Sequence, residues 1–507
     1  MNIKSIVAAG VAAALPLLPS AAETFVWTGA SDSFWTNAAN WRVDGVAAGR
    51  CPGARISSDS DWEMPTGDTA IFDGTGAAGA TSVDLDGLCS IGFVRVTGAD
   101  APRYVFGKDA TQTLGFEMNG GFSVEASVPA ASAPIVNANL AHTANYDYDW
   151  KGTASTGLTT YYTNACPGRV VVNGAFGTRK LRPGSKTDYA EWSVAVYNVG
   201  GFEFNAEQPA TGYLYSYYFR GTGSYWYNAN AVVHKLIHYY NDCTVNIAKG
   251  VQFGTSKGNN LAVMTRDGCT VTMAGEGEFR VSDNNGNGYS PVKRGFLDVD
   301  YGRLQVKCAM VPNPAAADLI VRSNRSTGAG VLDLTECPSN GFTGSLVFLD
   351  YGNVQISDPD QLGNIAGIRL HRNGSASANR LDWSGAEGTL SLPVCYTNSN
   401  DFTIRNIGSG TLTVTSAVET EIANVVFGLN GETARVVFGG SFEGSVMPKM
   451  LLTGEVGISD SADLGEIDAI HFKNGTLVLE GVGEKTFGKP LISEAGANAV
   501  VLSAGDV

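Results

Sequence analysis

The feature of this sequence that most limits its fold is a recurring five-residue unit: glycine, any residue, an apolar residue, a residue that is usually polar, and a second apolar residue. Glycine permits the positive φ of a tight corner, and the alternation after it places two side chains on one face of a β-strand. One such unit cannot bury that face alone, so the units must stack on one another, as in a solenoid. The unit is found at Gly120–Val124, Gly200–Phe204, Gly277–Val281, Gly295–Val299, Gly302–Val306, Gly330–Leu334, Gly352–Ile356, Gly388–Leu392, Gly410–Val414 and Gly475–Leu479.

Two copies of the unit are close in detail, because Asp300–Val306 is echoed by Asp350–Ile356, with four of the seven residues identical. The spacing between units is irregular, which favours an all-β parallel β-helix with loops of variable length over a propeller. We expect rungs of about 20–25 residues and a rod roughly 80–95 Å long. The side chains predicted to point inward are Leu304, Val306, Leu332, Leu334, Val354 and Ile356. Those predicted to face solvent are Arg303, Gln305, Asp333 and Gln355.

Part of this region resembles a known family. Gly330–Leu334, Phe342–Gly344, Gly352–Ile356 and Leu362-Gly363 together look like one autotransporter-associated β-strand repeat. The Gly-Thr-Leu stretches that begin at 388, 410 and 475 resemble degenerate starts of further copies. The resemblance covers roughly residues 290–507 and implies a right-handed parallel β-helix of the bacterial cell surface. Autotransporters of that family continue into a membrane domain of alternating strands, a pattern that this sequence lacks.

The segment 23–100 has a different composition and resembles the stretch found ahead of such repeats. It contains Trp27, Trp35, Trp41 and Trp62, which we interpret as a cap over the open end of the solenoid. The alternative is a carbohydrate-binding module. We therefore divide the chain into a signal peptide at 1–22, a Trp-rich capping module at 23–100, an irregular β-helix region at 101–289 and a repeat solenoid at 290–507.

The N-terminus has the pattern of a secretory signal peptide. Met1–Lys4 is short and positive, Ile6–Leu18 is almost wholly apolar, and Ser20–Ala22 supplies small residues for cleavage before Glu23. The apolar run is too short to span a bilayer and contains Pro16, so no transmembrane segment is predicted. We expect an exported protein, extracellular or on the outer cell surface.

The charge of the chain bears on its partners, and its cysteine content bears on disulfide formation. Only 16% of the residues are charged and the formal net charge is −15, which argues against a nucleic-acid partner. The cysteines lie at 51, 89, 166, 243, 269, 308, 337 and 395, an even number that in an exported chain permits disulfides. Buried free thiols are the alternative for several of them.

An aromatic cluster in the middle of the chain is the candidate carbohydrate site. Tyrosines alternate along a predicted strand that ends at Phe219, and Gly221–Ser224 looks like a hairpin turn after which further aromatic residues return opposite them. Exposed, this face would stack on sugar rings; buried, it would be an ordinary aromatic core. The candidate residues are Tyr213, Tyr215, Tyr217, Tyr225, Trp226 and Tyr227.

One segment matches the opening of a calcium loop. Asp283, Asn285 and Asn287 occupy the first alternating positions of an EF-hand pattern, but Arg294 stands where the bidentate glutamate is needed. The alternative interpretation is an Asn/Gly-rich turn between strands. Calcium is the only cofactor that the sequence suggests.

No motif predicts catalysis. His234 and His238 have the spacing of a helical zinc pair but lack the intervening glutamate, and the Gly-x-Ser-x-Gly match at 254–258 has no helix after it. We find no local cluster of Asp with Arg or Lys. The predicted function is therefore structural or adhesive, with a polysaccharide or another surface glycan as ligand; the alternative is a secreted polysaccharide lyase or glycoside hydrolase on the same fold.

The last unit, Gly475–Leu479, is followed by neither an amphipathic helix nor a charged edge. A solenoid whose last rung is uncapped offers its backbone to any other strand. We therefore expect that the chain either belongs to a longer protein or associates end to end with a partner or a second copy.

Overall fold

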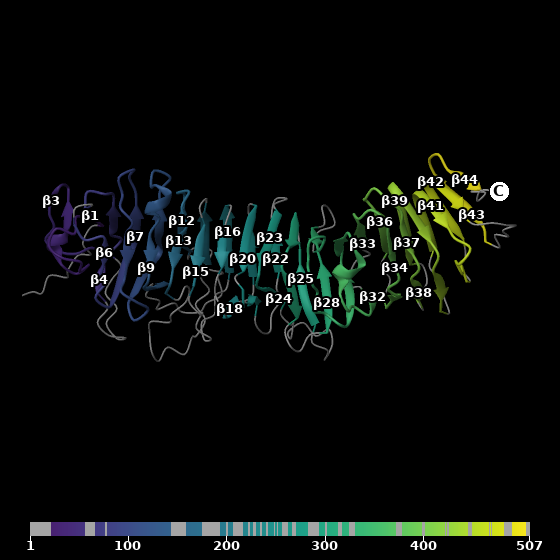
Figure 1. Cartoon of the computed structure of the whole chain (residues 1–507), viewed down its shortest axis with the longest axis horizontal. Coiled ribbons are helices and arrows are strands. Elements are labelled where there is room, and N and C mark those ends of the chain that lie inside the picture. The colour runs from purple at the N-terminus through teal and green to yellow at the C-terminus, as the bar shows by residue number, and fades with distance from the viewer. Residues whose placement is uncertain are drawn as a thin grey trace, which may run out of the picture.

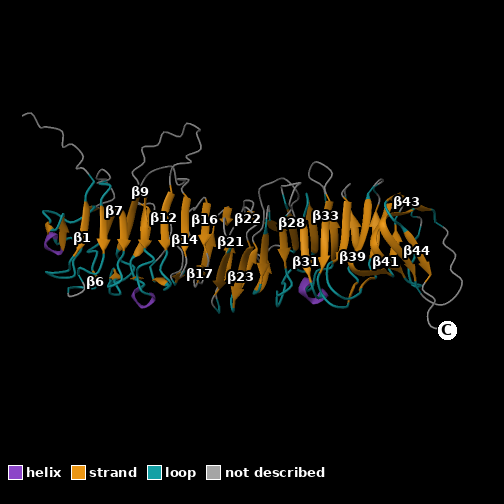
Figure 2. Cartoon of the chain, turned by 90° about the horizontal axis from the view of Figure 1, so that it is seen from above, coloured by secondary structure: helices purple, strands orange, loops and turns teal. Residues whose placement is uncertain are grey.

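The computed structural model shows a long rod of stacked strands (Figure 1). It describes residues 22–55, 66–76, 79–142, 159–174, 193–198, 201–205, 216–221, 224–226, 230–233, 236–239, 242–247, 249–250, 252–255, 262–265, 270–281, 294–299, 302–312, 317–323, 330–371, 378–397, 401–420, 422, 425–444, 449–465, 467, 469–480 and 489–502. Almost all of the regular structure is β-strand (Figure 2), and the helices are short 3-10 turns: η1 (Ala38–Asn40), η2 (Ala130–Ser132) and η3 (Pro359–Leu362). The predicted signal peptide, except its last residue, lies outside the described residues.

The strands form three sheets that run along the rod. Sheet A contains β1 (Thr24–Trp27), β2 (Trp41–Val43), β3 (Val46–Ala47), β4 (Ala54–Arg55), β5 (Thr69–Phe72), β7 (Leu88–Val96), β9 (Thr113–Val124), β11 (Asn139–His142), β12 (Thr159–Asn164), β14 (Ser193–Asn198), β16 (Ser216–Gly221), β19 (Leu236–Tyr239), β22 (Ala262–Thr265), β25 (Arg294–Asp298), β28 (Asp318–Arg322), β30 (Ser345–Leu349), β32 (Gly367–Leu370), β35 (Val394–Tyr396), β38 (Ala417–Thr420) and β40 (Ser441–Glu443).

Sheet B lies beside it and reaches the end of the described chain. It contains β6 (Ser82–Val83), β8 (Val105–Phe106), β10 (Ile135–Val136), β13 (Val170–Val172), β15 (Phe202–Phe204), β17 (Ser224–Trp226), β20 (Cys243–Ile247), β23 (Thr270–Gly275), β26 (Arg303–Val306), β29 (Val331–Asp333), β31 (Asn353–Ile356), β33 (Ala378–Trp383), β34 (Gly388–Leu390), β36 (Asp401–Asn406), β37 (Leu412–Val414), β39 (Val426–Phe438), β41 (Lys449–Ile458), β42 (Ile470–Leu479), β43 (Leu491–Ala495) and β44 (Ala499–Leu502). Sheet C is short: β18 (Asn230–Val233), β21 (Gln252–Thr255), β24 (Glu278–Val281) and β27 (Ala309–Pro312).

The order of the strands shows how the chain winds. β22, β23 and β24 lie in sheets A, B and C in turn, and β25, β26 and β27 repeat that order one rung further along. Apart from the pairs β1–β2, β2–β3 and β4–β7, the described strand pairs are parallel. The protein is therefore a parallel β-solenoid, as the sequence predicted. Rung length varies more than we expected: Leu304 is in register with Leu332, 28 positions on, and Leu332 with Val354, 22 positions on.

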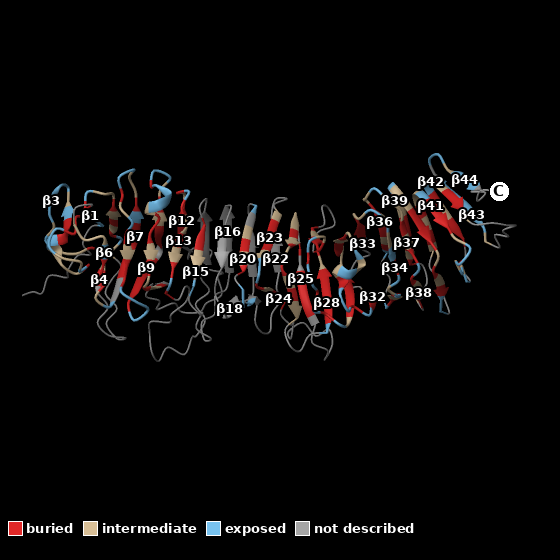
Figure 3. Ribbon diagram, viewed as in Figure 1, coloured by how far each residue is buried: buried red, intermediate tan, exposed pale blue. Residues whose placement is uncertain are grey.

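The inward side chains of sheet B form a continuous column. In-register pairing joins Val271, Leu304, Leu332, Val354, Leu381, Ile404, Leu429, Leu452 and Phe472. Every member is at most 3% exposed, and Figure 3 shows buried residues on strands toward both ends of the rod. The six aliphatic residues predicted to point inward are all buried, which confirms the predicted register of these units.

The prediction that Asp333 faces solvent is wrong. Its side chain points away from the core column, but the residue is only 3% exposed. Arg303 Nη1 donates to one carboxylate oxygen at 2.5 Å, and the backbone N–H and hydroxyl of Thr335 donate to the other at 3.0 and 2.6 Å. Alternation along a strand predicts which way a side chain points, but not whether it is exposed. The outward carboxylate of Asp333 is covered by Arg303 from a neighbouring rung. Arg303, Gln305 and Gln355 are partly exposed.

The glycines of the repeated units serve a different purpose from the one we expected. Gly302 does have a positive φ, of 69°. At Gly120 and Gly330, a Cβ atom would lie 2.0 and 2.4 Å from the carbonyl oxygens of Gly92 and Val299 on the preceding rung. Those two positions require glycine because another backbone approaches closely there.

The N-terminal end of the rod is closed by tryptophans. Trp27, Trp35 and Trp41 are completely buried, and the Trp41 ring centroid lies 4.9 and 4.8 Å from those of the other two. Each indole N–H donates to a backbone carbonyl, at 2.8 to 3.0 Å. The predicted Trp-rich cap is confirmed, and these three indoles are inaccessible to a sugar. Trp62 lies outside the described residues. The parallel ladder already begins with β1 and β5, within the segment assigned to the cap.

A buried carboxylate fixes the cap to the first rungs. Asp68 has a fully buried side chain that accepts hydrogen bonds from Arg50 and from the backbone N–H groups of Glu23 and Gly53. Burial alone would raise the pKa of Asp68, but these hydrogen bonds and the nearby guanidinium lower it below the ordinary value of 3.8.

The core column gives a first prediction. Leu332→Asp should lower the free energy of unfolding by about 4 kcal/mol, because an unpaired carboxylate would enter the stack. Asp333→Asn should cost about 1.5 kcal/mol through its weakened bonds to Arg303 and Thr335. Gln305→Ala, on the same outer face, should stay within about 0.5 kcal/mol of the wild type in urea unfolding. Equal costs for Leu332→Asp and Gln305→Ala would contradict the register.

The cap gives a second prediction. Asp68→Asn should destabilise the protein by about 2 kcal/mol near neutral pH, because Arg50 loses the buried one of its two carboxylate partners, Asp68 and Glu23. A carboxyl whose pKa is lowered by folding stabilises the native state above its unfolded pKa, and this contribution disappears as the pH falls through its folded pKa. The difference between wild type and variant, measured by urea unfolding, should therefore shrink below the ordinary value of 3.8. Asp44→Asn, in an exposed turn, is the matched control; a pH-independent difference at Asp68 would oppose this account.

Candidate functional site

The structure separates the aromatic residues singled out from the sequence. Tyr217 lies on β16, whereas Tyr225 and Trp226 lie on β17; Tyr213, Tyr215 and Tyr227 are outside the described residues. The predicted hairpin is wrong, because β16 pairs in parallel with β14 and β19, and β17 pairs in parallel with β15 and β20. β16 belongs to sheet A and β17, the next strand along the chain, belongs to sheet B.

The candidate metal ligands are not placed. Asp283, Asn285 and Asn287 lie outside the described residues, as do His234 and Ser256. His238 lies on strand β19, so the helical spacing of a zinc pair does not apply to it. Within the described part of the chain, no three His, Cys, Asp or Glu side chains are grouped to hold a metal ion.

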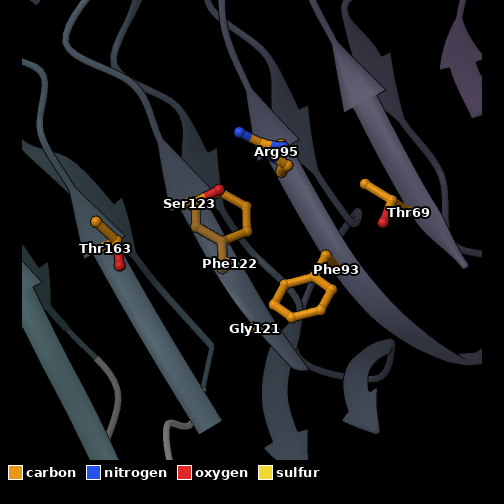
Figure 4. A pocket seen from close by; sticks show the side chains of 7 residues that line it. All are labelled: Thr69, Phe93, Arg95, Gly121, Phe122, Ser123 and Thr163. Atoms are coloured by element: carbon orange, nitrogen blue, oxygen red, sulfur yellow. The ribbon is translucent and has the colours of Figure 1, made fainter. Parts of the chain in front are cut away.

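A groove of about 380 Å³ lies on sheet A, over β5, β7, β9 and β12 (Figure 4). It was not foreseen from the sequence. Pairing places Phe93 between Thr69 and Gly121 on the neighbouring strands, and Arg95 beside Ser123. The residues that line the groove are Thr69, Phe93, Arg95, Gly121, Phe122, Ser123 and Thr163.

The exposed ring of Phe93 follows from local strand geometry. The register between β7 and β9 shifts between Ile91 and Phe93, at Gly92, where a Cβ atom would meet the carbonyl oxygen of Asp68 at 2.8 Å. After this corner the alternation restarts. Val94 and Val96 are fully buried, whereas Phe93 is 38% exposed beside a glycine that leaves space next to the ring (Figure 4).

The positive charge of Arg95 in the groove is neutralised by a neighbouring carboxylate. Arg95 forms an ion pair with Glu125 at 2.7 Å, and the Thr97 hydroxyl donates to the same carboxylate at 2.7 Å. Both charged side chains are partly exposed, at 50% and 38%, so water screens the pair. Among the lining residues the other polar side chains are hydroxyls, of Thr69, Ser123 and Thr163. An exposed ring flanked by hydroxyl groups is suited to a neutral ligand with one apolar face and many hydroxyls.

Sheet B carries an acidic and basic cluster that we did not expect. Asp382 accepts hydrogen bonds from Arg380 at 3.1 Å and from Arg405 at 2.9 and 2.8 Å, and Arg303 binds Asp333 two rungs away. Sequence reasoning missed it because Asp382 and Arg405 are 23 positions apart and only the rung register brings them together. The two carboxylate side chains are just 2% and 4% exposed, beneath their arginines. The cluster joins rungs and does not offer an accessible acid or base.

Three buried cysteines are free thiols. They are Cys166, Cys308 and Cys337, so the disulfides that the sequence allowed do not join these three. Burial raises the pKa of the Cys308 thiol to about 12 and also raises the pKa of Cys166 and Cys337. Because the thiolate is the reactive form, burial of these three side chains opposes their reaction in the folded protein.

The fold and the groove together define a parallel β-solenoid with a closed N-terminal end and a ligand-sized depression on one face. No family model, curated protein or solved structure matches the chain. Among the described residues there is no helix with the length and apolar character needed to cross a membrane.

The cysteines provide a third prediction. At about pH 8, where a free thiol with an ordinary pKa reacts readily, Cys166, Cys308 and Cys337 should resist alkylation by iodoacetamide in the folded protein. They should react fully in denaturant. Mass spectrometry after differential isotopic labelling measures each site separately. Rapid native alkylation of Cys308, the most strongly shifted of the three, would count against its placement in the core.

Proposed function

We propose that this protein is an exported solenoid of the bacterial cell exterior, structural or adhesive in role, that binds carbohydrate in the groove around Phe93. The observation that carries the proposal is an exposed aromatic ring with free space beside it and hydroxyl groups around it. Its export is supported by the signal-peptide pattern of Met1–Ala22. Its place at the cell surface is supported by the resemblance of residues 330–363 to autotransporter-associated repeats.

The groove crosses the strands, so it extends along the rod. Thr69, Phe93 and Gly121 belong to successive rungs, roughly 4.8 Å apart. A polysaccharide lying along this line would meet a new rung with each step and could place the apolar face of a sugar on the Phe93 ring. The balanced charge of Arg95 and Glu125 favours a neutral glycan over a strongly acidic one.

Binding without chemistry is favoured by the composition of the groove. Glycoside hydrolysis requires a pair of carboxyl groups around the scissile bond. The only ionisable side chain among the lining residues is that of Arg95, and the nearby Glu125 is engaged by Arg95 and Thr97. A lyase or hydrolase on this fold is therefore the alternative outcome of the test below.

The fourth prediction tests the groove. Once a glycan array has identified a ligand, Phe93→Ala should weaken its affinity about tenfold, since an aromatic contact contributes roughly 0.5–1.5 kcal/mol beyond its buried area. Phe93→Trp should retain binding. Phe34→Ala is the matched control, because Phe34 is 40% exposed but lies at the capped end. Isothermal titration calorimetry gives the affinities.

Three results would contradict the proposal. Unchanged affinity of Phe93→Ala would move the binding site elsewhere, and equal losses for the two alanine variants would point to a non-specific effect. Release of unsaturated or reducing sugars from the bound polysaccharide would show an enzyme.

We also propose that the last described rung is covered by another surface, either a further segment of chain or a second copy that associates end to end. The support is a set of exposed apolar side chains on β43 and β44: Leu491, Ile492, Val500 and Val501, which are 41–52% exposed. Large apolar side chains at one end of a rod favour burial against another surface.

A further inference from the structure

The outer face of sheet B carries a surplus of positive charge where its acidic and basic side chains meet. The guanidiniums of Arg303, Arg380 and Arg405 neutralise two carboxylates, those of Asp333 and Asp382, so one positive charge is left over. The carboxylates are covered, whereas the three arginine side chains are 30–37% exposed. On a chain with a net charge of −15, this surplus attracts an anion to one point of the surface. The strands concerned, β33 and β36, lie side by side toward the C-terminal end of the rod (Figure 1).

Arg380 makes the fewest hydrogen bonds of the three arginines. Its Nε atom donates to Asp382 at 3.1 Å, whereas Arg405 donates to the same carboxylate through both Nε and Nη2. Within the described structure, neither Nη atom of Arg380 has an acceptor. Burial lowers the pKa of Arg380 below its ordinary value of 12.5; Asp382 opposes this change and the charge of Arg405 adds to it. The guanidinium therefore stays charged at neutral pH and has two nitrogens free to donate.

Two polar side chains flank Arg380 on the neighbouring rungs. In-register pairing places Asn353 of β31 on one side of it and Thr403 of β36 on the other. Asn353 is at an outward position, opposite in direction to the buried Val354, yet it is only 2% exposed. Neither the oxygen nor the nitrogen of its amide has a hydrogen-bond partner. Because buried amides are normally hydrogen-bonded, this one is available to a group bound beside Arg380.

Uncharged polar groups surround the arginines. Gly428 pairs with Thr403, and a Cβ atom at this glycine would lie 2.6 Å from Thr403 Oγ1, so the partly exposed hydroxyl borders a position without a side chain. Gln355 and Asn430 lie at the two ends of the adjacent row of outward residues, on β31 and β39. Their side-chain oxygens accept hydrogen bonds, but their amide nitrogens donate to no described residue. Donors of this kind can bond to the hydroxyls of a sugar.

We propose that this face of sheet B binds the carboxylate of an acidic sugar. The residues that we assign to the carboxylate, named here the Arg380 site, are Asn353, Arg380, Thr403 and Arg405. A guanidinium can hold a carboxylate through two parallel N–H···O bonds, and one surplus charge matches one carboxylate. The net charge of −15 opposes binding of a densely charged polymer, so the ligand is a glycan whose carboxylates are separated by uncharged sugars. The Arg380 site lies on sheet B and does not depend on the Phe93 groove of sheet A.

The fifth prediction uses a hyaluronan hexasaccharide, in which carboxylates alternate with uncharged sugars, and its methyl ester, which lacks the charge. Isothermal titration calorimetry should show that the acid binds at least about tenfold more tightly than the ester, because hydrogen bonds to a charged acceptor are the stronger ones. Arg380→Gln should weaken binding of the acid at least about tenfold, and Thr403→Val about threefold. Arg42→Gln, which removes an exposed arginine in the cap, is the matched control.

A further variant separates loss of the site from loss of the fold. Asn353→Leu removes a buried amide that has no partner, so the free energy of unfolding should stay the same or rise. Its affinity for the hyaluronan hexasaccharide should nevertheless fall about threefold. Urea unfolding checks that Arg380→Gln is folded, which we expect because Arg405 still holds Asp382 through two hydrogen bonds.

The remaining outcomes would each overturn the proposal. Acetate that binds as tightly as the hexasaccharide would identify a site for a free anion, with no part for the sugar. Equal affinity for the methyl ester, or an equal loss in Arg42→Gln, would remove the role of Arg380. Loss of hyaluronan binding in Phe93→Ala would place this ligand in the groove instead. Unchanged hyaluronan affinity in Phe93→Ala would support two separate sites, and failure of the groove to bind a neutral glycan does not affect this test.

Discussion

Contact between equivalent side chains on neighbouring rungs is the interaction on which this molecule depends. A single rung has no core of its own, since Leu332 is buried only because Leu304 and Val354 lie in register on either side of it. Stability is therefore shared between neighbours along the rod, as in other repeat proteins. Polar side chains also contact their equivalents on the neighbouring rungs. Asn173 Nδ2 donates to Asn137 Oδ1, and Asn205 Nδ2 donates to Asn173 Oδ1, each at 2.8 Å. The close approach of rung backbones that makes this stacking possible also requires glycine at corners such as Gly330.

The sequence predicted what is local to each unit. Alternation identified the inward aliphatic residues, and the density of tryptophan before Asp100 identified the cap. It could not predict which unit lies beside which, because the loops make rung lengths unequal. That information decides whether an outward residue is exposed: Asp333 is covered by Arg303 thirty positions away, and Asp382 by Arg405. The hairpin expected at Gly221 was wrong for the same reason, since parallel pairing across rungs prevailed over pairing within one.

The groove shows a second limit of sequence reasoning. Phe93 belongs to Leu88–Val96, where Gly92–Val96 matches the repeated glycine unit although it was not recognised as a copy. Phe93 occupies the second position of the unit, where any residue is allowed, so the pattern gave no reason to single it out. The Phe93 ring is accessible because of the next rung, where Gly121 has no side chain to fill the space beside the ring. The candidate aromatic residues near Tyr217 were more numerous, but those that the structure describes, Tyr217, Tyr225 and Trp226, lie on strands of two different sheets. A binding surface on a solenoid is assembled across rungs, so the number of aromatic residues in one segment does not locate it.

The tryptophan cap lies at the end of the rod that is synthesised first. Synthesis proceeds from the N-terminus, so the residues that close the core are made before the strands they protect. We therefore expect each later rung to fold onto the strand edge of the rung before it, on a core whose N-terminal side is already closed. A seal at the other terminus would have left every intermediate open at both ends. When the cap is made first, only the growing end exposes apolar core and unpaired backbone groups at any stage of synthesis.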